Sequence, residues 1–457
     1  MLQYLAMSYI PRHVEIDLQR LLQEDAPHRD VILIEGARQV GKTTLVEHVL
    51  GQQHVPFISL NLEKQALLRS RIDETREFAE FEQLLGDELD FDPGANCVLF
   101  IDEAQESLKL GAYVRFMKES WRGARVILSG STLTRLFRGD ARYPVGRVKR
   151  LVLRPFTFTE FLRAMAKERL AAEIMEDPTR ITPTRHEHLL ELLDQYLIVG
   201  GLPEIVKAYA AGGDWRHRRS EIFADYEQDF LRIFGEDLIA VIKGCLRSVA
   251  NHVGSPSKNS SVIPEPTNRI NEQIKRVFAR LESWRLILHS EQRRISPEAS
   301  HRYLPKRYLF DTGILRQLRE KAVPTIRLLG TLNAAERRPL GGIVENQLAI
   351  ELMNQTGELA GWKKTPAGLE IDFVMSVAER TFPIECKAIR RTKKTHLRGL
   401  FAYLDLFKQN TALVVSFAPF EVIEGRNGIR IINVPLYLAE QITEILRSLC
   451  GDQKLRF

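Results

Sequence analysis

The stretch Val31-Ile-Leu-Ile-Glu35-Gly36-Ala-Arg-Gln-Val-Gly41-Lys42-Thr43-Thr44 decides the fold of the N-terminal third of the chain. Its first five residues form a continuous apolar run, which predicts a buried strand. The next eight match the pattern GxxxxGK[ST], and they lead into a predicted helix, Lys42–Leu50. In this context the glycines let successive backbone N–H groups curve around phosphates, and the helix N-terminus adds partial positive charge. The alternative is a glycine turn before an ordinary helix.

The loop after the first strand is therefore predicted to bind Mg-ATP. Lys42 is expected to reach the β- and γ-phosphates, and the Thr43 hydroxyl is expected to bind Mg²⁺. The residues expected to contact the nucleotide are Gly36, Ala37, Arg38, Gln39, Val40, Gly41, Lys42, Thr43 and Thr44.

Further apolar runs of strand length follow this loop. They are Phe57–Leu62, Cys97–Ile101, Arg125–Ser129 and Arg150–Leu153. Amphipathic stretches such as Gln65–Leu85 separate them. Apolar strands that alternate with helices predict an α/β domain with a mostly parallel sheet.

Two acidic residues, Asp102 and Glu103, directly follow the predicted strand Cys97–Ile101. The carboxyl ends of parallel strands border the crevice where phosphates bind. Asp102 is expected to hold Mg²⁺ through water, and Glu103 to orient and activate the attacking water. The alternative is a pair of solvated acids after a strand.

Two weaker candidates lie farther along. A hydroxyl in Ser129-Gly-Ser131 is placed to sense the γ-phosphate, and Ser131 is favoured over Ser129. The stretch Asp140–Arg147 contains Arg142 and Arg147, and such arginines can act on the γ-phosphate of a neighbouring subunit in a homo-oligomer. Arg147 is the one chosen here, against the alternative of an exposed arginine.

Length and composition bound the remaining possibilities. At 457 residues the chain predicts two to four domains, and 44% hydrophobic with 27% charged residues is typical of a soluble globular protein. No apolar run approaches membrane-spanning length, and the first residues do not resemble a secretory signal. The four cysteines are scattered without a CxxC pair, which favours a cytoplasmic location. A net charge of +6 permits a nucleic-acid partner without requiring one.

Near Pro155 the pattern becomes helical. Thr157-Phe-Thr-Glu160 is a capping box that opens a helical region to about Phe234, broken at Gly200–Pro203. Residues 254–268 are predicted to be a loop. A helix Arg269–Trp284 and strands Leu286–His289 and Arg307–Phe310 then give the outline of a winged helix. The outer face of this helix carries Arg269, Lys275, Arg276 and Arg280, which predicts DNA contact, against the alternative of an interdomain packing unit.

The C-terminal part is predicted to be α/β again. Its expected elements are a helix Ile343–Asn354, strands Glu370–Met375 and Phe382–Ala388, a helix near Leu397–Phe407 and a strand Ala412–Ser416.

Charged residues mark a second candidate site in this part. Glu385 and Lys387 share one face of their predicted strand, and Asp372 lies on the strand before it. Glu345 falls inside the apolar arc of its predicted helix, where a carboxylate needs a cation or a donor. Lys387 or a metal is expected to provide that partner.

Carboxylates that can bind a divalent ion, together with a lysine, are the residue types needed for metal-dependent phosphodiester hydrolysis. Asp372 and Glu385 would bind a second divalent ion, and Lys387 would support the nucleophile or the transition state. The four candidate catalytic residues are Glu345, Asp372, Glu385 and Lys387. The alternative is a charged cluster that forms a buried salt bridge or binds a partner.

The order of GARQVGKTT, VLFIDEAQ, LSGS and GRVKRLVLRPFTFTEFL resembles the AAA+ superfamily. With YLIVGGLPEIV, KRYLFDTGIL, VENQLAIEL and EIDFV…PIECKA, the chain resembles the prokaryotic branch in which a C-terminal domain of unknown function follows the ATPase. The resemblance covers about residues 9–420. It implies a PD-(D/E)xK restriction-endonuclease-like C-terminal fold, in which Ile371-Asp372 replaces the usual Pro-Asp.

The resemblance also implies a domain order. It is an AAA+ P-loop core (1–155), a helical lid (156–235), a winged-helix-like region (236–335) and the endonuclease-like domain (336–457). Adenine contact is implied for Tyr9–Arg12. The lid departs from the pattern, because it supplies no clear nucleotide-sensing arginine.

Two functions fit the sequence. In one, an ATP-hydrolysing AAA+ protein is directed to DNA and gates a metal-dependent nuclease. In the other, a nucleotide-switched regulatory or scaffolding ATPase binds a partner through a C-terminal domain that does not cleave.

Overall fold

The structure is a computed structural model of the 457-residue chain. It describes residues 9–24, 29–137, 146–176, 180–256, 258–263, 267–293, 303–319, 322–364, 368–425 and 428–450. The chain divides into two compact units, Met1–Arg154 and Pro155–Phe457. None of the helices formed by these residues is long and apolar enough to cross a membrane.

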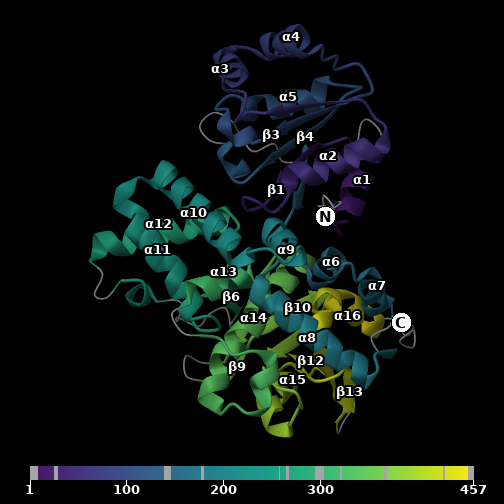
Figure 1. Cartoon of the computed structure of the whole chain (residues 1–457), viewed down its shortest axis with the longest axis vertical. Helices are drawn as coiled ribbons and strands as arrows, with labels where there is room; N and C mark the ends of the chain where they lie inside the picture. The colour runs from purple at the N-terminus through teal and green to yellow at the C-terminus, as the bar shows by residue number, and fades with distance from the viewer. Residues whose placement is uncertain are drawn as a thin grey trace. The chain divides into compact units, whose positions relative to one another are not determined.

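The N-terminal unit is built around a parallel sheet of five strands in the order β2-β3-β4-β1-β5 (Figure 1). The strands are β1 (Val31–Glu35), β2 (Phe57–Asn61), β3 (Val98–Asp102), β4 (Arg125–Gly130) and β5 (Val148–Val152). The α-helices are α1 (Glu15–Gln23), α2 (Lys42–Gln53), α3 (Ala66–Glu74), α4 (Phe78–Leu89) and α5 (Leu110–Ser120), with short 3-10 helices η1 (Ala104–Glu106) and η2 (Leu133–Arg135). The predicted parallel α/β domain is confirmed.

Both faces of this sheet are covered, which explains why its strands are apolar throughout. Val31 and Leu33 join a core with residues of α4 and α5, while the alternate residues Ile32 and Ile34 are buried on the other face. All five residues of β1 and of β3 are buried. The single helix expected over Gln65–Leu85 is two helices, because Thr75 after α3 adopts an extended conformation (φ −61°, ψ 138°).

The second unit begins with helices, as the capping box predicts. Thr157 accepts from the backbone of Glu160, and the Glu160 side chain accepts from the backbone N–H of Thr157. The helices that follow are α6 (Phe158–Ala164), α7 (Glu168–Glu176), α8 (Pro183–Val199), α9 (Pro203–Ala210), α10 (Trp215–Phe234), α11 (Glu236–Asn251), η4 (Asn259–Ser261), α12 (Asn268–Ser283), α13 (Thr312–Leu318) and η5 (Ile326–Gly330). Gly200, at φ 88°, ends α8 as expected.

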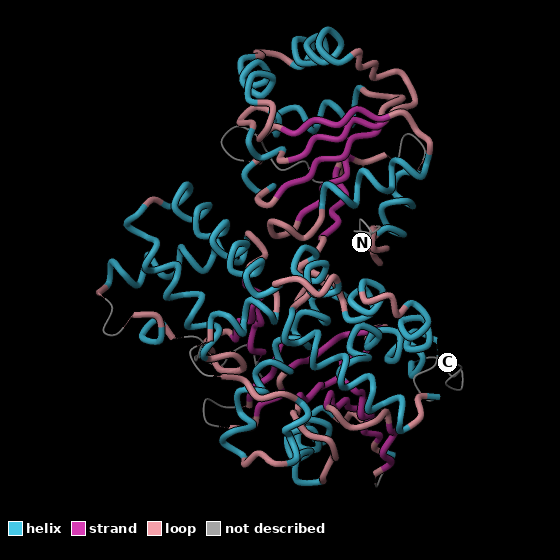
Figure 2. The backbone as a smooth tube through the Cα atoms, viewed as in Figure 1, coloured by secondary structure: helices cyan, strands magenta, loops and turns pink. Residues whose placement is uncertain are grey.

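Two sheets occupy the rest of this unit (Figure 2). The four-stranded sheet has the order β7-β6-β8-β9 and contains β6 (Ile287–Arg293), β7 (Lys306–Leu309), β8 (Leu359–Lys363) and β9 (Glu370–Ile371). The five-stranded sheet has the order β10-β11-β12-β14-β13 and contains β10 (Phe373–Val377), β11 (Arg380–Cys386), β12 (Thr411–Ser416), β13 (Glu421–Glu424) and β14 (Arg430–Pro435). The accompanying helices are α14 (Ala334–Thr356), η6 (Lys394–Leu397), α15 (Arg398–Phe407), η8 (Leu436–Gln441) and α16 (Ile442–Cys450).

The four-stranded sheet differs from the expected hairpin. Strands β6 and β7 pair antiparallel as predicted, but β6 also pairs in parallel with β8, from Ser290↔Leu359 to Arg293↔Trp362. The strand expected over Glu370–Met375 is interrupted at Asp372. Its first part joins β8, and its second part joins β11.

Helix α14 joins the two sheets. It begins at Ala334 rather than at the predicted Ile343, because Asn333 and Glu336 form a capping box there. It packs against β11 of one sheet and against β6, β7 and β8 of the other. Glu345, near its middle, therefore lies where side chains from both sheets can meet.

Candidate functional site

The phosphate loop connects β1 to α2, and left-handed backbone at two positions shapes it. Gln39 has φ 61° and Gly41 has φ 92°. Lys42 folds back over the loop and donates to the carbonyl oxygens of Gly36 (3.1 Å) and Ala37 (3.0 Å). Its side chain is 5% exposed, and this burial lowers the pKa of the amine. The predicted phosphate-binding lysine is thus held at the loop.

The other loop residues are placed as follows. Gly36 lies so close to Leu153, the residue after β5, that a Cβ at position 36 would be 2.2 Å from the Leu153 carbonyl oxygen. Ala37 and Val40 are buried, Arg38 pairs with Glu63 at 2.9 Å, and Thr44 is exposed. Only glycine therefore fits at position 36.

Asp102 is the polar centre of the site. It is 3% exposed, and its Oδ2 accepts from the Thr43 hydroxyl (2.7 Å) and from Asn61 Nδ2 (3.0 Å). Its Oδ1 accepts from the Ser129 hydroxyl and from the backbone N–H of Glu103. The two predicted Mg²⁺ ligands, Thr43 and Asp102, are thus in direct contact. A hydroxyl and a carboxylate are oxygen ligands of the kind that Mg²⁺ prefers, so the residues fit the ion.

Glu103 follows Asp102 in a left-handed conformation (φ 49°, ψ 42°). Burial raises the pKa of its carboxyl group, and the Lys42 amine opposes this shift. Gln105, two residues on, donates to Glu103 Oε2 at 2.5 Å. The predicted water-activating carboxylate is therefore close to the phosphate-binding lysine and accepts a hydrogen bond from a neighbouring side chain.

Two other predicted nucleotide contacts, Ser131 and the Arg147 expected to act on a neighbouring subunit, remain predictions. Ser131 follows β4, is partly exposed and forms no hydrogen bond with the residues that the structure describes, whereas Ser129 contacts Asp102. Arg147 pairs with Glu119 at 2.9 Å. Arg142 lies outside the described residues.

The segment before β1 supports the loop in a way that sequence alone did not predict. Arg12 is 7% exposed and donates to the carbonyl oxygens of Val40 (3.1 Å) and Arg154 (2.6 Å). Tyr9 stacks on His48 of α2, with ring centroids 3.6 Å apart. Adenine contact by Tyr9–Arg12 remains a prediction, and in this structure the Arg12 guanidinium binds the two carbonyls.

In the second unit, the predicted carboxylates converge on a lysine that the sequence analysis missed. Lys306, the first residue of β7, is 1% exposed. Its amine lies 3.1 Å from Glu345 Oε1, 3.1 Å from Asp372 Oδ1 and 2.6 Å from Glu370 Oε1. Burial disfavours the charged amine, but Asp372 and Glu345 outweigh it, so the pKa of Lys306 is raised well above its usual value.

The second half of the cluster lies one strand away. Asp372 Oδ2 accepts from the backbone N–H of Cys386 at 2.9 Å, which places it beside Glu385. Lys387 contacts Glu385, with its side chain 34% exposed. Burial and the Asp372 carboxylate together raise the pKa of Glu385 to about 8. Glu345 also accepts from the Tyr308 hydroxyl at 2.8 Å.

Lys387 was expected as a partner of Glu345, but the amine that contacts Glu345 is that of Lys306, because β7 brings it against α14. Alternation along β7 was the available signal, since Lys306 and Tyr308 are two apart and so share a face. The described residues contain no group of three or more His, Cys, Asp or Glu side chains arranged to hold a metal ion. Asp372 and Glu385 as metal ligands remain a prediction.

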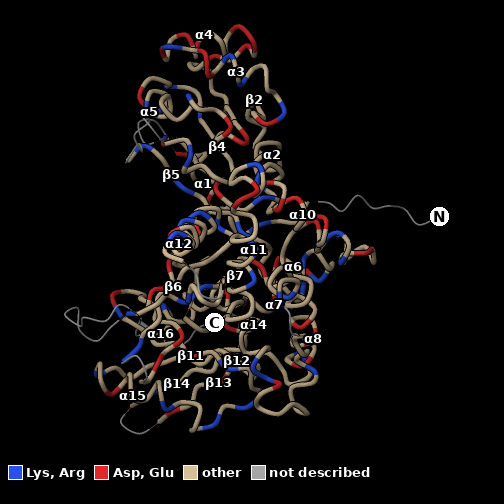
Figure 3. The backbone as a smooth tube through the Cα atoms, turned by 90° about the vertical axis from the view of Figure 1, so that its left-hand side faces the viewer, with Lys and Arg blue, Asp and Glu red and all other residues tan. Residues whose placement is uncertain are grey.

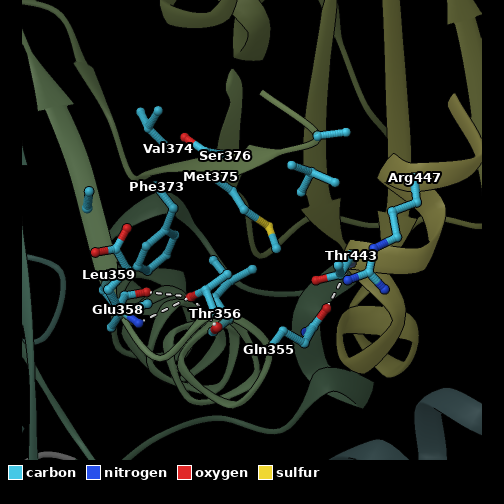
Figure 4. Close-up of a pocket in the computed structure, with 14 residues that line it drawn as sticks. Gln355, Thr356, Glu358, Leu359, Phe373, Val374, Met375, Ser376, Thr443 and Arg447 are labelled. Carbon is cyan, nitrogen blue, oxygen red and sulfur yellow. Dashed lines mark hydrogen bonds between the residues drawn. The ribbon is translucent and has the colours of Figure 1, made fainter. Parts of the chain in front are cut away.

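A cavity of about 290 Å³ lies elsewhere in this unit (Figure 4). The end of α14, β8, β10 and α16 line it, and Phe373 and Met375 extend from β10 toward α14. Gln355 accepts from the backbone N–H of Thr443 at its rim. None of the four predicted nuclease residues lines this cavity.

The predicted DNA-contacting helix is α12. Its Lys275 pairs with Glu272 at 2.7 Å, and Arg280 lies over the ring of Phe234. Along the backbone of the chain, Lys and Arg residues are interspersed with Asp and Glu residues (Figure 3). DNA binding by this helix remains a prediction.

Comparison with known families assigns the units separately. Residues 28–162 match the family described as an AAA domain. Residues 190–324 and 340–437 match two domains of unknown function, DUF8612 and DUF4143. A search of curated proteins found no match.

Two solved structures are similar to parts of this chain. The Walker-type ATPase PABY2304 of Pyrococcus abyssi is 17% identical over 68% of this chain and 96% of its own, with a TM-score of 0.42. A chain from a study of katanin self-assembly is 14% identical over 35% of this chain and 56% of its own, with a TM-score of 0.25. Both scores are below 0.5, so the assignment rests on the family match and the geometry.

The parallel sheet, the phosphate loop and the AAA-domain match together define the N-terminal unit. It is similar to AAA-type P-loop ATPase domains over the residues that match. The match to DUF4143 does not establish an endonuclease-like fold for residues 340–437.

Proposed function

We propose that the chain binds Mg-ATP at the loop Gly36–Thr44 and hydrolyses it with Glu103 as the residue that activates water. The observation that carries this proposal is the contact between the Thr43 hydroxyl and Asp102 Oδ2. It joins the phosphate loop to the acidic end of β3, which are the two parts that an ATPase of this class has to combine.

Each side chain has a distinct part in this proposal. Lys42 exchanges its loop carbonyl partners for phosphate oxygens, and its charge favours the developing negative charge of the transition state. Bound Mg²⁺ would supply further charge neutralisation and a template for the phosphates. Thr43 and Asp102 would hold the ion, and Glu103 would accept a proton from the attacking water.

The experiment is a steady-state ATPase assay of the purified full-length chain, paired with nucleotide binding measured by isothermal titration. We expect Mg²⁺-dependent turnover that Lys42→Ala abolishes. A wild-type chain that binds ATP but shows no turnover above that of Lys42→Ala would overturn the hydrolytic part of the proposal. A chain that binds no nucleotide would overturn all of it.

For the second unit, we favour a partner-binding role over DNA cleavage. Lys306 supports this choice, because its amine contacts Glu345, Glu370 and Asp372 at 2.6 to 3.1 Å and offsets part of their negative charge. Carboxylates this close need a positive charge among them, and a buried lysine supplies one without a metal. The chain would then act as a nucleotide-switched regulatory or scaffolding ATPase.

The competing proposal is an ATP-gated, metal-dependent nuclease in which Asp372 and Glu385 bind the ion. The full-length chain is incubated with single- and double-stranded DNA, with and without Mg²⁺ or Mn²⁺ and ATP. We expect no cleavage under any of these conditions. Metal-dependent cleavage that Asp372→Asn abolishes, with ATP hydrolysis intact, would establish the nuclease instead. The same mixtures, followed by gel shift in rising salt, test DNA contact by α12.

A further inference from the structure

Gln105 occupies a specific place beside the proposed catalytic carboxylate. It lies on η1 directly after β3 and is 4% exposed. Its Nε2 donates to Glu103 Oε2 at 2.5 Å. A buried amide that donates to a carboxylate is a strong, charge-assisted contact, so it fixes the direction of the Glu103 side chain.

The other end of the same amide faces β4. Gly130 ends that strand, and a Cβ built at Gly130 would lie 1.8 Å from Gln105 Oε1. The Oε1 atom is buried and has no hydrogen-bond partner among the described residues. A buried amide oxygen without a partner costs about 1–3 kcal/mol. The amide keeps this position although its oxygen has no hydrogen-bond partner among the described residues, while its nitrogen donates a hydrogen bond to Glu103.

We propose that Gln105 is a positioning residue that holds Glu103 for the attack of water on ATP. The inference rests on the proposed function and names a residue that acts on the same site. The backbone of Glu103 is left-handed. Its side chain has several rotatable bonds, so the direction in which the carboxylate points depends on what the carboxylate contacts. Gln105 supplies that contact from the protein side.

The absence of a side chain at Gly130 is part of the same arrangement. Any larger residue there would displace the Gln105 amide, because the space that a Cβ would take is already occupied by Oε1. Gly130, the last residue of β4, therefore influences the position of Glu103 indirectly, by leaving room for the Gln105 amide.

The first test replaces Gln105 by methionine, which keeps the length of the side chain and removes the amide. We expect kcat to fall by about tenfold or more, since misdirecting a general base forfeits part of its 10²–10⁴-fold contribution. The Kd for ATP should stay within about twofold of wild type, because no phosphate contact is removed. Gln83→Met, at an exposed position of α4, is the matched control and should leave both values unchanged.

The second test leaves Gln105 in place. Gly130→Ala should lower kcat in the same way, and in the Gln105→Met background it should add little further loss, because the amide contact with Glu103 is already absent. Thermal unfolding identifies variants that fail to fold.

Wild-type kcat in a folded Gln105→Met variant would overturn the inference while leaving the ATPase proposal intact. So would additive losses in the double variant. Absence of turnover in the wild-type chain would instead overturn the ATPase proposal itself.

Discussion

The hydroxyl of Thr43 donates a 2.7 Å hydrogen bond to Asp102 Oδ2, although 59 residues separate the two in the chain. The parallel register explains the contact. Strand β1 pairs with β4, and β4 pairs with β3, so the loop after β1 and the acids after β3 emerge at the same edge of the sheet. The contact therefore depends on the strand order and on both residue types.

Lys42→Ala and Glu103→Gln should separate binding from turnover. Lys42→Ala removes the cation nearest the phosphates and should weaken ATP binding severely. Glu103→Gln should keep ATP affinity within about twofold and lower kcat by about 10²-fold or more. Titration calorimetry and single-turnover hydrolysis measure the two effects. Equal loss of affinity in both variants would contradict the assigned roles.

Arg12→Met should weaken nucleotide binding by removing a support of the phosphate loop. The guanidinium holds the Val40 carbonyl oxygen at 3.1 Å between two left-handed residues of the loop. Without that buried, charge-assisted bond we expect ATP to bind about tenfold more weakly, corresponding to about 1.4 kcal/mol. Arg20→Met, at an exposed position of α1, is the control and should bind ATP like wild type. Unchanged ATP affinity in Arg12→Met would show that the loop does not need this support.

Lys306→Met should destabilise the second unit strongly. It removes the amine that Glu345, Glu370 and Asp372 share and leaves the buried Glu345 and Asp372 without a paired lysine, while Glu370 keeps Lys363 at 3.2 Å. Breaking a buried ion pair in this way costs about 3–5 kcal/mol. Lys387→Met is the matched control, because this partly exposed lysine pairs with Glu385 and should cost about 1 kcal/mol or less. Urea unfolding of each variant measures the difference, and equal effects would be evidence against Lys306 as the central cation.

The stability of Glu351→Gln relative to wild type should rise with pH. Glu351 is 2% exposed, and burial together with the nearby Glu440 carboxylate raises its pKa well above the ordinary value of 4.5. The folded chain therefore holds this proton more tightly than the unfolded chain. Its contribution to stability is complete below pH 4.5 and is lost as the pH rises toward the folded-state pKa.

Urea unfolding at pH 5, 7 and 9 provides the measurement, because the glutamine cannot ionise. The free energy of unfolding of Glu351→Gln minus that of wild type should increase by up to about 1.4 kcal/mol per pH unit. A difference that stays constant or decreases over this range would mean that Glu351 is ionised in the folded chain.

Sequence alone predicted the nucleotide domain well because its signals are local. Strand β1, the glycine loop and the start of α2 are contiguous, and the acids at Asp102 directly end a second apolar run. What the sequence could not predict depends on long-range contact. Ser131 was favoured over Ser129 as the γ-phosphate sensor, and that role stays untested; which hydroxyl reaches Asp102 is set by the twist and register of β4.

For the carboxylate cluster too, the sequence predicted the local features but not the long-range contact. Its convergence could be predicted from alternation along strands and from Glu345 within an apolar helix face. Its cation could not be assigned, because Lys306 lies 39 residues from Glu345 and 66 from Asp372. Lys387 is nearer to Asp372 in sequence but forms an ion pair with Glu385 alone among the described carboxylates.

The parallel pairing of β6 with β8 sets a condition on where this protein can be cut. A fragment that ends at residue 335 would retain β6 and β7 but lose β8, leaving the row of backbone N–H and C=O groups from Ser290 to Arg293 without its partner strand. Such an open edge is a template for pairing with other chains, so the fragment should aggregate. Expressing the two parts separately would consequently leave β6 in one fragment and β8 in the other, each without the strand it pairs with in the whole chain.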